Sequence, residues 1–173
     1  MKTDEERNSR TTALGLARYA RDYLEAALVV DEHLGKRPRY LRVAPIPAYF
    51  LLTHALELTL KAYLRAGGLT VEELSARPLG HDLRALYSKA CDLGLPALYQ
   101  LTEEDSSALH LLAELNEGHQ LRYVEAGAKT FPSWAIAEPF VVRLHQAVAP
   151  TIGLESLAIA YPAVAAATPT RRG

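Results

Sequence analysis

The sequence predicts an all-α protein, a single antiparallel bundle of about five helices. Apolar residues recur every three or four positions along most of the 173-residue chain, which is the spacing of one helix face. Segments that alternate apolar and polar residues, as half-buried strands do, are nearly absent. Glycine and proline residues divide the chain into segments of helix length. A chain of this length is typical of one domain with one hydrophobic core.

The first two predicted helices carry much of the apolar surface. The first spans residues 9–34, shows a stripe of alanine and leucine at helical spacing, and ends at Gly35. A proline-containing loop follows, because proline interrupts helical hydrogen bonding. The second helix spans residues 47–66 and ends at Gly67 and Gly68. It is apolar nearly all round, so we expect it to be the central helix.

Shorter helical segments follow in the second half of the chain. Thr70 and Glu73 fit a capping box, which predicts one short helical turn there. Further helices are expected at 81–94, at 102–117, from 134 or 139 to 148, and at 153–164, with an irregular loop at 122–133. The folded domain is expected to span residues 9–165, with flexible ends at residues 1–8 and 166–173.

Composition and charge exclude several classes of protein. The chain has 19 basic and 20 acidic side chains, so it is not a strongly basic nucleic-acid coat. Its single cysteine, Cys91, excludes a disulfide framework and a cysteine-rich zinc site. The N-terminus lacks the apolar segment of a secretory signal, and no apolar stretch is long enough to cross a bilayer. We therefore expect a cytoplasmic protein with no membrane partner.

The region from the second to the third predicted helix resembles a known superfamily. The residues that carry the resemblance are Ala55-Leu56-Glu57-Leu58-Thr59-Leu60-Lys61-Ala62-Tyr63-Leu64, then Gly67-Gly68, then His81-Asp82-Leu83, and later Leu121-Arg122-Tyr123. They are similar to the pattern of HEPN domains over about residues 45–148. The resemblance implies a helical bundle, often a homodimer, of the kind found in prokaryotic toxin–antitoxin pairs, defence systems and partners of nucleotidyltransferases.

Many HEPN proteins are metal-independent ribonucleases with an arginine that precedes a histidine by four to six intervening residues. None of the six histidines of this chain has an arginine at that distance. Arg77 precedes His81 with three residues between them, and Arg143 precedes His145 with one. The ribonuclease signature is therefore absent, and we expect a non-catalytic member. An active nuclease would need a divergent site, with His81 or His119 as acid and base and Arg77 or Arg122 holding the phosphate.

A cluster of polar residues is predicted where the second helix meets the third. His54, Glu57 and Lys61 share one helix face, and His81 with Asp82 can approach them if the two helices pack together. The preferred interpretation is a buried network in which Glu57 holds the His81 loop, Asp82 caps the third helix and Lys61 balances charge. A cleft that binds a phosphate, a nucleotide or an RNA end is the second interpretation. A metal site on His54, Glu57, His81 and Asp82 is the third and least favoured, so no metal or cofactor is expected.

Two further segments carry groups that suit nucleic acid. The basic run contains Lys36, Arg37, Arg39, Tyr40 and Arg42, and it is either a solvated loop or a phosphate-contacting patch with a tyrosine that stacks on a base.

The second such segment carries His119, Gln120, Arg122 and Tyr123. These residues either pin their loop to helix-end carbonyls or bind a phosphate and a base.

Together these observations predict a HEPN-like binding or scaffold protein in a nucleic-acid-linked, toxin–antitoxin or defence pathway. The expected partners are a second copy of the chain, a nucleotidyltransferase-type protein, and RNA or a nucleotide. The alternatives are the divergent endoribonuclease described above and a purely structural dimeric helical protein without a ligand.

Overall fold

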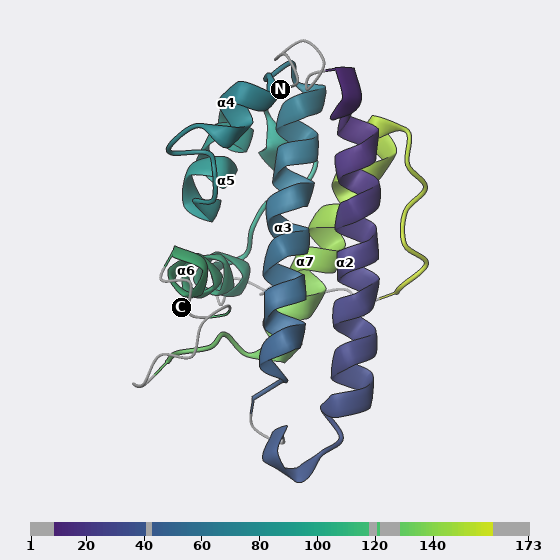
Figure 1. The fold of residues 1–173 in the computed structure, drawn as a ribbon, viewed down its shortest axis with the longest axis vertical. Helices are drawn as coiled ribbons and strands as arrows, with labels where there is room; N and C mark the ends of the chain where they lie inside the picture. Colours follow the sequence, from purple (N-terminus) through teal and green to yellow (C-terminus); the bar gives the residue numbers. More distant parts are fainter. Residues whose placement is uncertain (1–8, 41–42, 118–120, 122–128, 161–173) are drawn as a thin grey trace, which may run out of the picture.

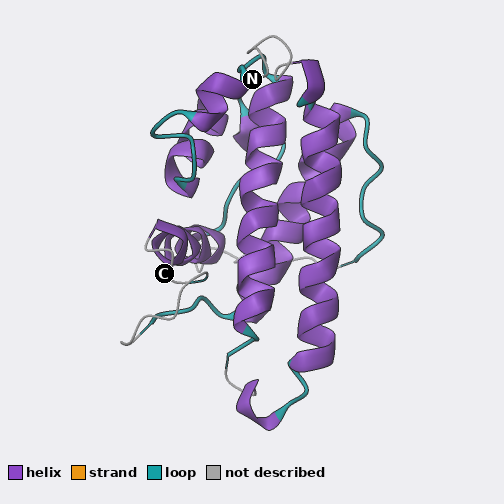
Figure 2. Ribbon diagram, viewed as in Figure 1, coloured by secondary structure: helices purple, strands orange, loops and turns teal. Residues whose placement is uncertain are grey.

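The computed structural model describes residues 9–40, 43–117, 121 and 129–160, and all regular structure in those residues is helical. The elements in chain order are α2 (Ala13–Leu34), η1 (Pro38–Tyr40), α3 (Ile46–Ala66), α4 (Val71–Ser75), α5 (Leu83–Asp92), η2 (Leu95–Ala97), α6 (Glu103–Glu117), α7 (Trp134–Val148) and η3 (Ala149–Ile152) (Figures 1 and 2). Five of these helices have at least ten residues in the described part of the chain. The all-α class is therefore confirmed.

Helices α2 and α3 form the longest pair and the centre of the fold. They lie side by side in Figure 1 and run antiparallel, since Arg65 near the end of α3 reaches the carbonyl of Thr11 before α2. Every fourth residue of α3 is a fully buried leucine over four turns: Leu52, Leu56, Leu60 and Leu64. The prediction that this helix is central is confirmed, because it contacts α2, α5 and α7.

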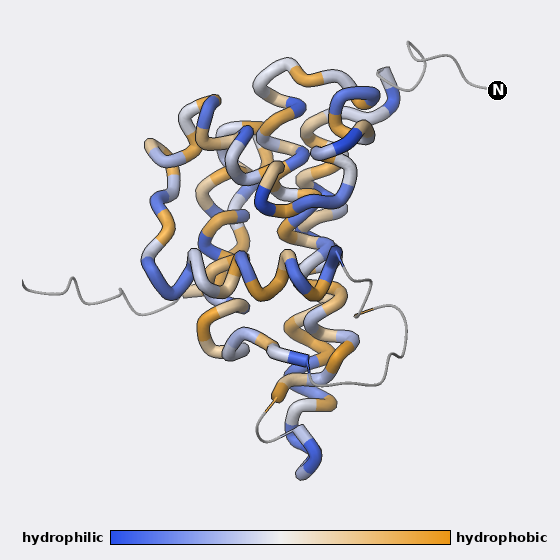
Figure 3. Tube along the Cα trace, turned by 90° about the vertical axis from the view of Figure 1, so that its left-hand side faces the viewer, coloured by the Kyte–Doolittle hydropathy of each residue, from blue (hydrophilic) through white to orange (hydrophobic). Residues whose placement is uncertain are grey.

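Helix α7 covers the α2–α3 pair from behind and completes the core (Figure 1). Its inner face, Phe140, Val141 and Leu144, is fully buried. Tyr49 of α3 anchors the start of α7, since its hydroxyl donates to the carbonyl of Pro132 at 2.6 Å and its ring meets Trp134 edge to face. In Figure 3 the hydrophobic residues of these long helices alternate with hydrophilic ones at helical spacing.

Helices α4, α5 and α6 form a second group on one side of α3. Thr70 and Glu73 make the capping box that the sequence predicts at α4, with bonds of 3.2 and 2.7 Å. Helix α5 packs on α3, and α6 contacts both α5 and α7. Because α6 is seen nearly end-on in Figure 1, it runs across the long helices and not along them.

Two predicted boundaries move, each for a local reason. The first helix begins at Ala13, because Thr12 is extended and its hydroxyl caps the amide of Gly15 at 3.0 Å. The third begins at Leu83, with Asp82 as its N-cap. The last begins at Trp134, the earlier of its two predicted starts, and keeps Pro139 inside it. Proline there removes only the bond to the carbonyl of Ala135, which is an exposed residue.

The expected helix at residues 153–164 is wrong for residues 154–160, which form no helix. Gly153 has a φ of 81° and ends η3, so the chain turns away from a helical path. The segment packs on α7 instead, where Gln146 Nε2 donates to the carbonyls of Leu157 and Ile159 at 2.8 and 2.7 Å. Residues 161–164 lie outside the described residues. Within the described ranges, no helix combines the length and apolarity that a bilayer span requires.

Candidate functional site

Glu57 is a buried carboxylate on α3 that binds two cationic or protonatable side chains. Glu57 is only 3% exposed. Lys61, one turn later on the same helix, donates from Nζ to Glu57 Oε1 at 2.8 Å. The imidazole of His81 places Nδ1 at 3.2 Å from Oε1 and 3.4 Å from Oε2. The ammonium group and the imidazole therefore share a carboxylate that water scarcely reaches.

The loop before α5 is held against α3 by its backbone as well. Lys61 Nζ donates to the carbonyl of Gly80 at 2.6 Å. A Cβ at Gly80 would lie 3.0 Å from the carbonyl oxygen of Ser75, so glycine allows the loop to close tightly. On the other side, Asn116 of α6 donates from Nδ2 to the carbonyl of His81 at 2.8 Å. These contacts fix the backbone on both sides of the His81 side chain.

Asp82 caps α5 and takes no part in binding Glu57 or Lys61. Its Oδ1 accepts from the amides of Arg84 and Ala85 at 2.9 and 3.1 Å. Such a cap satisfies amides that have no partner inside the helix. The carboxylate of Asp82 is thereby engaged with backbone, as the buried-network interpretation predicts.

The side chain of His81 is 69% exposed and faces a hollow of about 500 Å³. Arg77, Asp82, Asn116 and Glu117 line the same hollow. Because a carboxylate only accepts hydrogen bonds, His81 Nδ1 donates toward Glu57, and the other ring nitrogen, Nε2, is left for other partners. The network is therefore buried at Glu57 and open to solvent at His81.

The groups of this hollow differ in how far they are already engaged. Glu117 pairs with Arg84, and Asp82 caps α5. Within the described part of the chain, the guanidinium of Arg77 makes no hydrogen bond or ion pair. The groups that remain for a ligand are therefore the Arg77 guanidinium and His81 Nε2.

His54 does not join this cluster. Its ring meets the ring of Tyr23 on α2 edge to face, with centroids 4.4 Å apart, and lies parallel to Phe50. Residues 54 and 57 start from the same side of α3, but His54 contacts Tyr23 of α2 and Glu57 binds His81 before α5. Over the ranges that the structure describes, no three histidine, cysteine or acidic side chains gather as metal ligands.

The basic run is only partly described. Lys36, Arg37 and Arg39 are exposed, and Tyr40 is half-buried. The guanidinium of Arg39 lies over the Tyr40 ring, 4.6 Å from its centroid. Arg42 lies outside the described residues, and so do His119, Gln120, Arg122 and Tyr123. The second predicted group on the 122–133 loop therefore stays a prediction.

Two buried polar contacts escape the sequence reasoning. Asp105 is 1% exposed and accepts from the Tyr99 hydroxyl at 2.9 Å and from Arg143 Nη2 at 3.2 Å. Burial raises the pKa of Tyr99 to about 12. Thr102 and Asp105 are spaced as a helix cap, which was the one available signal.

The second missed contact joins α7 to α3. His145 is fully buried, with Nδ1 at 3.2 Å from the hydroxyl of Thr59. Burial, helped by the charge of Arg21, lowers the pKa of His145 from 6.5 to about 4. This histidine is therefore a neutral core residue at physiological pH.

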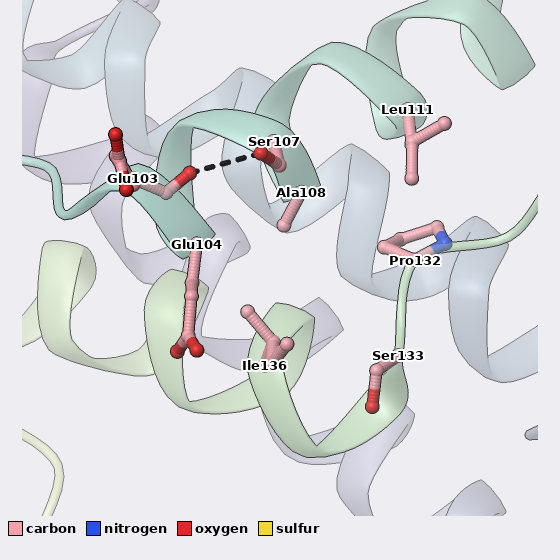
Figure 4. A pocket seen from close by; sticks show the side chains of 8 residues that line it. All are labelled: Glu103, Glu104, Ser107, Ala108, Leu111, Pro132, Ser133 and Ile136. Carbon is pink, nitrogen blue, oxygen red and sulfur yellow. Dashed lines mark hydrogen bonds between the residues drawn. The ribbon is translucent and has the colours of Figure 1, made fainter.

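A second hollow, of about 410 Å³, lies between α6 and α7 (Figure 4). Leu111, Pro132 and Ile136 give it an apolar lining, with Glu104 at its edge. The hydroxyl of Ser107 is used locally, since it donates to the carbonyl of Glu103 at 3.0 Å. This hollow contains none of the residues that the sequence singled out.

Comparisons with protein-family models, with curated proteins and with solved structures found no match to this chain. The interpretation of the site therefore depends on its own geometry and chemistry.

Proposed function

We propose that this chain is a HEPN-like, non-catalytic binding protein that holds a phosphate-bearing ligand, an RNA or a nucleotide, in the hollow beside His81. The single observation that carries the proposal is the combination of an exposed imidazole with a buried carboxylate that fixes it. A histidine held at Nδ1 presents Nε2 in one direction. Protonated there, it donates to a phosphate oxygen, and Arg77 supplies a permanent positive charge.

The charges of the hollow favour a phosphate over a cation. Both carboxylates at its edge are already engaged, one with the backbone of α5 and one with Arg84. Lys61 neutralises Glu57 behind the imidazole. Within the described part of the chain, Arg77 is the charged side chain of this hollow that makes no hydrogen bond or ion pair, and an anion completes it.

The affinity of the protein for a 5′-phosphorylated single-stranded RNA tests the proposal. Fluorescence anisotropy should show that Arg77→Ala and His81→Ala each weaken binding about tenfold, since a hydrogen bond to a charged group contributes roughly 1.5–3 kcal/mol. Lys89→Ala, which removes an exposed charge from α5, is the matched control and should bind like the parent. Equal affinities for Arg77→Ala and Lys89→Ala would contradict the proposal.

The second candidate is a metal-independent endoribonuclease, and the Glu57–His81 pair favours it. A carboxylate that orients an imidazole is a general arrangement for acid–base catalysis. The parent protein, incubated with single-stranded RNA and a chelator, should leave the RNA intact if it only binds. Cleavage by the parent that is lost in His81→Ala would show that the protein is an endoribonuclease and contradict the non-catalytic function.

We infer that the chain pairs with a second copy through the exposed side of α2. Tyr19 and Val29 are 64% and 63% exposed there, the largest values among the exposed large apolar residues of the described chain. Arg18 and Asp22 lie in the first half of this face, and Glu25 and Glu32 lie in the second half. A two-fold pairing buries the apolar side chains of both copies. The third alternative, a purely structural dimer, would keep this interface without the ligand.

The cellular setting belongs to the proposal through the resemblance alone. A cytoplasmic toxin–antitoxin or defence pathway, with a nucleotidyltransferase-type partner, is the setting that the resemblance implies. A pull-down with such a partner from the neighbouring genes would test it directly.

A further inference from the structure

A third hollow, here called the α2–α7 hollow, lies between the end of α2 and the start of α7 and has a volume of about 490 Å³. Asp31 comes from the last turn of α2, Tyr40 from η1 and Trp134 from the first turn of α7. Lys36 and Glu32 complete the polar part of its lining. This hollow lies next to the residues that precede α3, whereas the His81 hollow is held by the second half of that helix. The two share no residue.

The inner wall of the α2–α7 hollow pairs a carboxylate with aromatic rings. Burial raises the pKa of Asp31, and the nearby indole N–H of Trp134 opposes that rise. The same indole nitrogen is buried and faces this carboxylate. The wall therefore offers an acceptor and flat aromatic surface within one concave site.

The rim of this hollow is cationic. Arg37 and Arg39 are exposed in the short segment between Lys36 and Tyr40, which both line the hollow, and the Arg39 guanidinium lies over the Tyr40 ring. Lys36 pairs loosely with Glu32 at 3.7 Å, with both side chains about three-quarters exposed. An exposed pair of this kind contributes little to stability, so Lys36 is readily redirected to a ligand.

A nucleotide carries groups that match both the inner wall and the rim of the α2–α7 hollow. A base is flat and stacks on aromatic rings, its edge carries N–H donors for a carboxylate, and its phosphate suits a cationic rim. A simple anion would be repelled by Asp31 and Glu32 on the wall. A simple cation would be repelled by the basic side chains of the rim, Lys36, Arg37 and Arg39. Only a ligand with a donor-bearing ring at one end and an anion at the other satisfies both.

We propose that the α2–α7 hollow is a nucleotide site, in which Asp31 accepts from the edge of the base, Tyr40 and Trp134 flank the ring, and Lys36 and Arg39 bind the phosphate. Guanine is the preferred base. Its adjacent N1–H and N2–H donors can both reach one carboxylate, whereas uracil presents a single N–H between two carbonyl oxygens. This site goes beyond the function proposed for His81 and does not depend on it.

The chain offers a direct probe, because Trp134 is its single tryptophan. Titration with GMP should quench the intrinsic tryptophan fluorescence saturably, with a lower dissociation constant than titration with UMP. A parallel titration of N-acetyltryptophanamide corrects for absorption by the nucleotide. Asp31→Asn, which keeps the shape of the side chain, should weaken the affinity for GMP about tenfold and leave the affinity for UMP unchanged. The double variant Lys36→Gln, Arg39→Gln should weaken the binding of both nucleotides and make their affinity depend less on salt concentration.

Controls separate this site from the one beside His81. His81→Ala should quench like the parent, and circular dichroism should show that each variant keeps the parent's helix content. A 5′-phosphorylated oligonucleotide that contains guanine, compared with free GMP, distinguishes a strand from a free nucleotide as the source. The proposal is overturned if neither nucleotide quenches saturably, if Asp31→Asn keeps the preference for GMP, or if His81→Ala abolishes the quenching.

Discussion

Glu57 shows how one buried carboxylate can link stability to ligand binding. It is 3% exposed, and its two partners approach from the same helix and from the loop before α5. A buried charge needs its partners, because removing one leaves the other in a poorly solvated place. At the same time the outer partner, His81, is mostly exposed. One residue therefore holds the loop in place and aims the imidazole.

Replacing Glu57 with glutamine should lower the free energy of unfolding by about 3 kcal/mol, the typical loss when one member of a buried ion pair is removed. Lys61 is left 13% exposed without its carboxylate. Urea denaturation followed by circular dichroism measures the change. Glu114→Gln, at an exposed position of α6, should unfold like the parent. An unchanged midpoint for Glu57→Gln would show that the pair does not stabilise the fold.

His145 makes the stability depend on pH in a defined window. Its pKa falls from 6.5 to about 4 on folding, so the unfolded chain binds the proton more readily. The folded state therefore loses stability as the pH drops from about 6.5 to about 4, by up to roughly 3 kcal/mol. Urea titrations of the parent and of His145→Asn should show a stability difference that shrinks toward low pH in this window. A difference that stays constant with pH would contradict this assignment.

At the scale of elements, helix ends matter more than helix interiors for the site. Helix α5 starts where it does because Asp82 caps it, and that start sets the distance from His81 to α3. The sequence predicts the caps of α4 and α5 well, since a cap depends on residues two or three positions apart. It misplaces the segment after Gly153, because the bonds from Gln146 to the carbonyls of Leu157 and Ile159 outweigh local helix preference.

Asp82→Ala should lower the free energy of unfolding by about 1 kcal/mol, the usual effect of losing an N-cap. Asp82→Asn keeps an acceptor at the cap and should restore most of that loss. Asp92→Ala, at the other end of α5, is the matched control, because an acidic side chain there opposes the helix dipole. Urea denaturation compares the three. Equal losses for Asp82→Ala and Asp92→Ala would rule out the cap.

At the scale of the molecule, hydrophobic periodicity predicts which helix is central, but it does not predict contacts between residues far apart in the chain. The leucines of α3 predict a central helix, and α3 packs against α2, α5 and α7. Glu57, Lys61 and His81 could be grouped in advance because a short segment connects them.

Asp105 with Arg143, and Thr59 with His145, lie 38 and 86 positions apart. Only the packing of α6 and α3 on α7 brings them together. The i, i+3 spacing groups His54 with Glu57 on one helix face, but the ring of His54 packs on Tyr23 of α2 instead.

The proposed pairing through α2 is also a property of the whole molecule. Size-exclusion chromatography with light scattering should give twice the 19.0 kDa mass of the chain. Tyr19→Glu with Val29→Glu should give a monomer of unchanged helix content, because two buried charges without partners destabilise an interface. Leu98→Glu, at an apolar site 42% exposed outside α2, is the control and should remain a dimer. A parent that is already monomeric would remove this interface from the account.

The account depends most on the claim that His81 Nε2 and Arg77 receive a phosphate. Histidine-ring resonances, followed by NMR during titration with a 5′-phosphorylated oligonucleotide, test this claim directly. We expect the His81 signals to shift saturably and those of the exposed His110 on α6 to stay in place. The same oligonucleotide without its phosphate should leave both unchanged. A phosphorylated strand that binds while the His81 signals do not move would contradict the account.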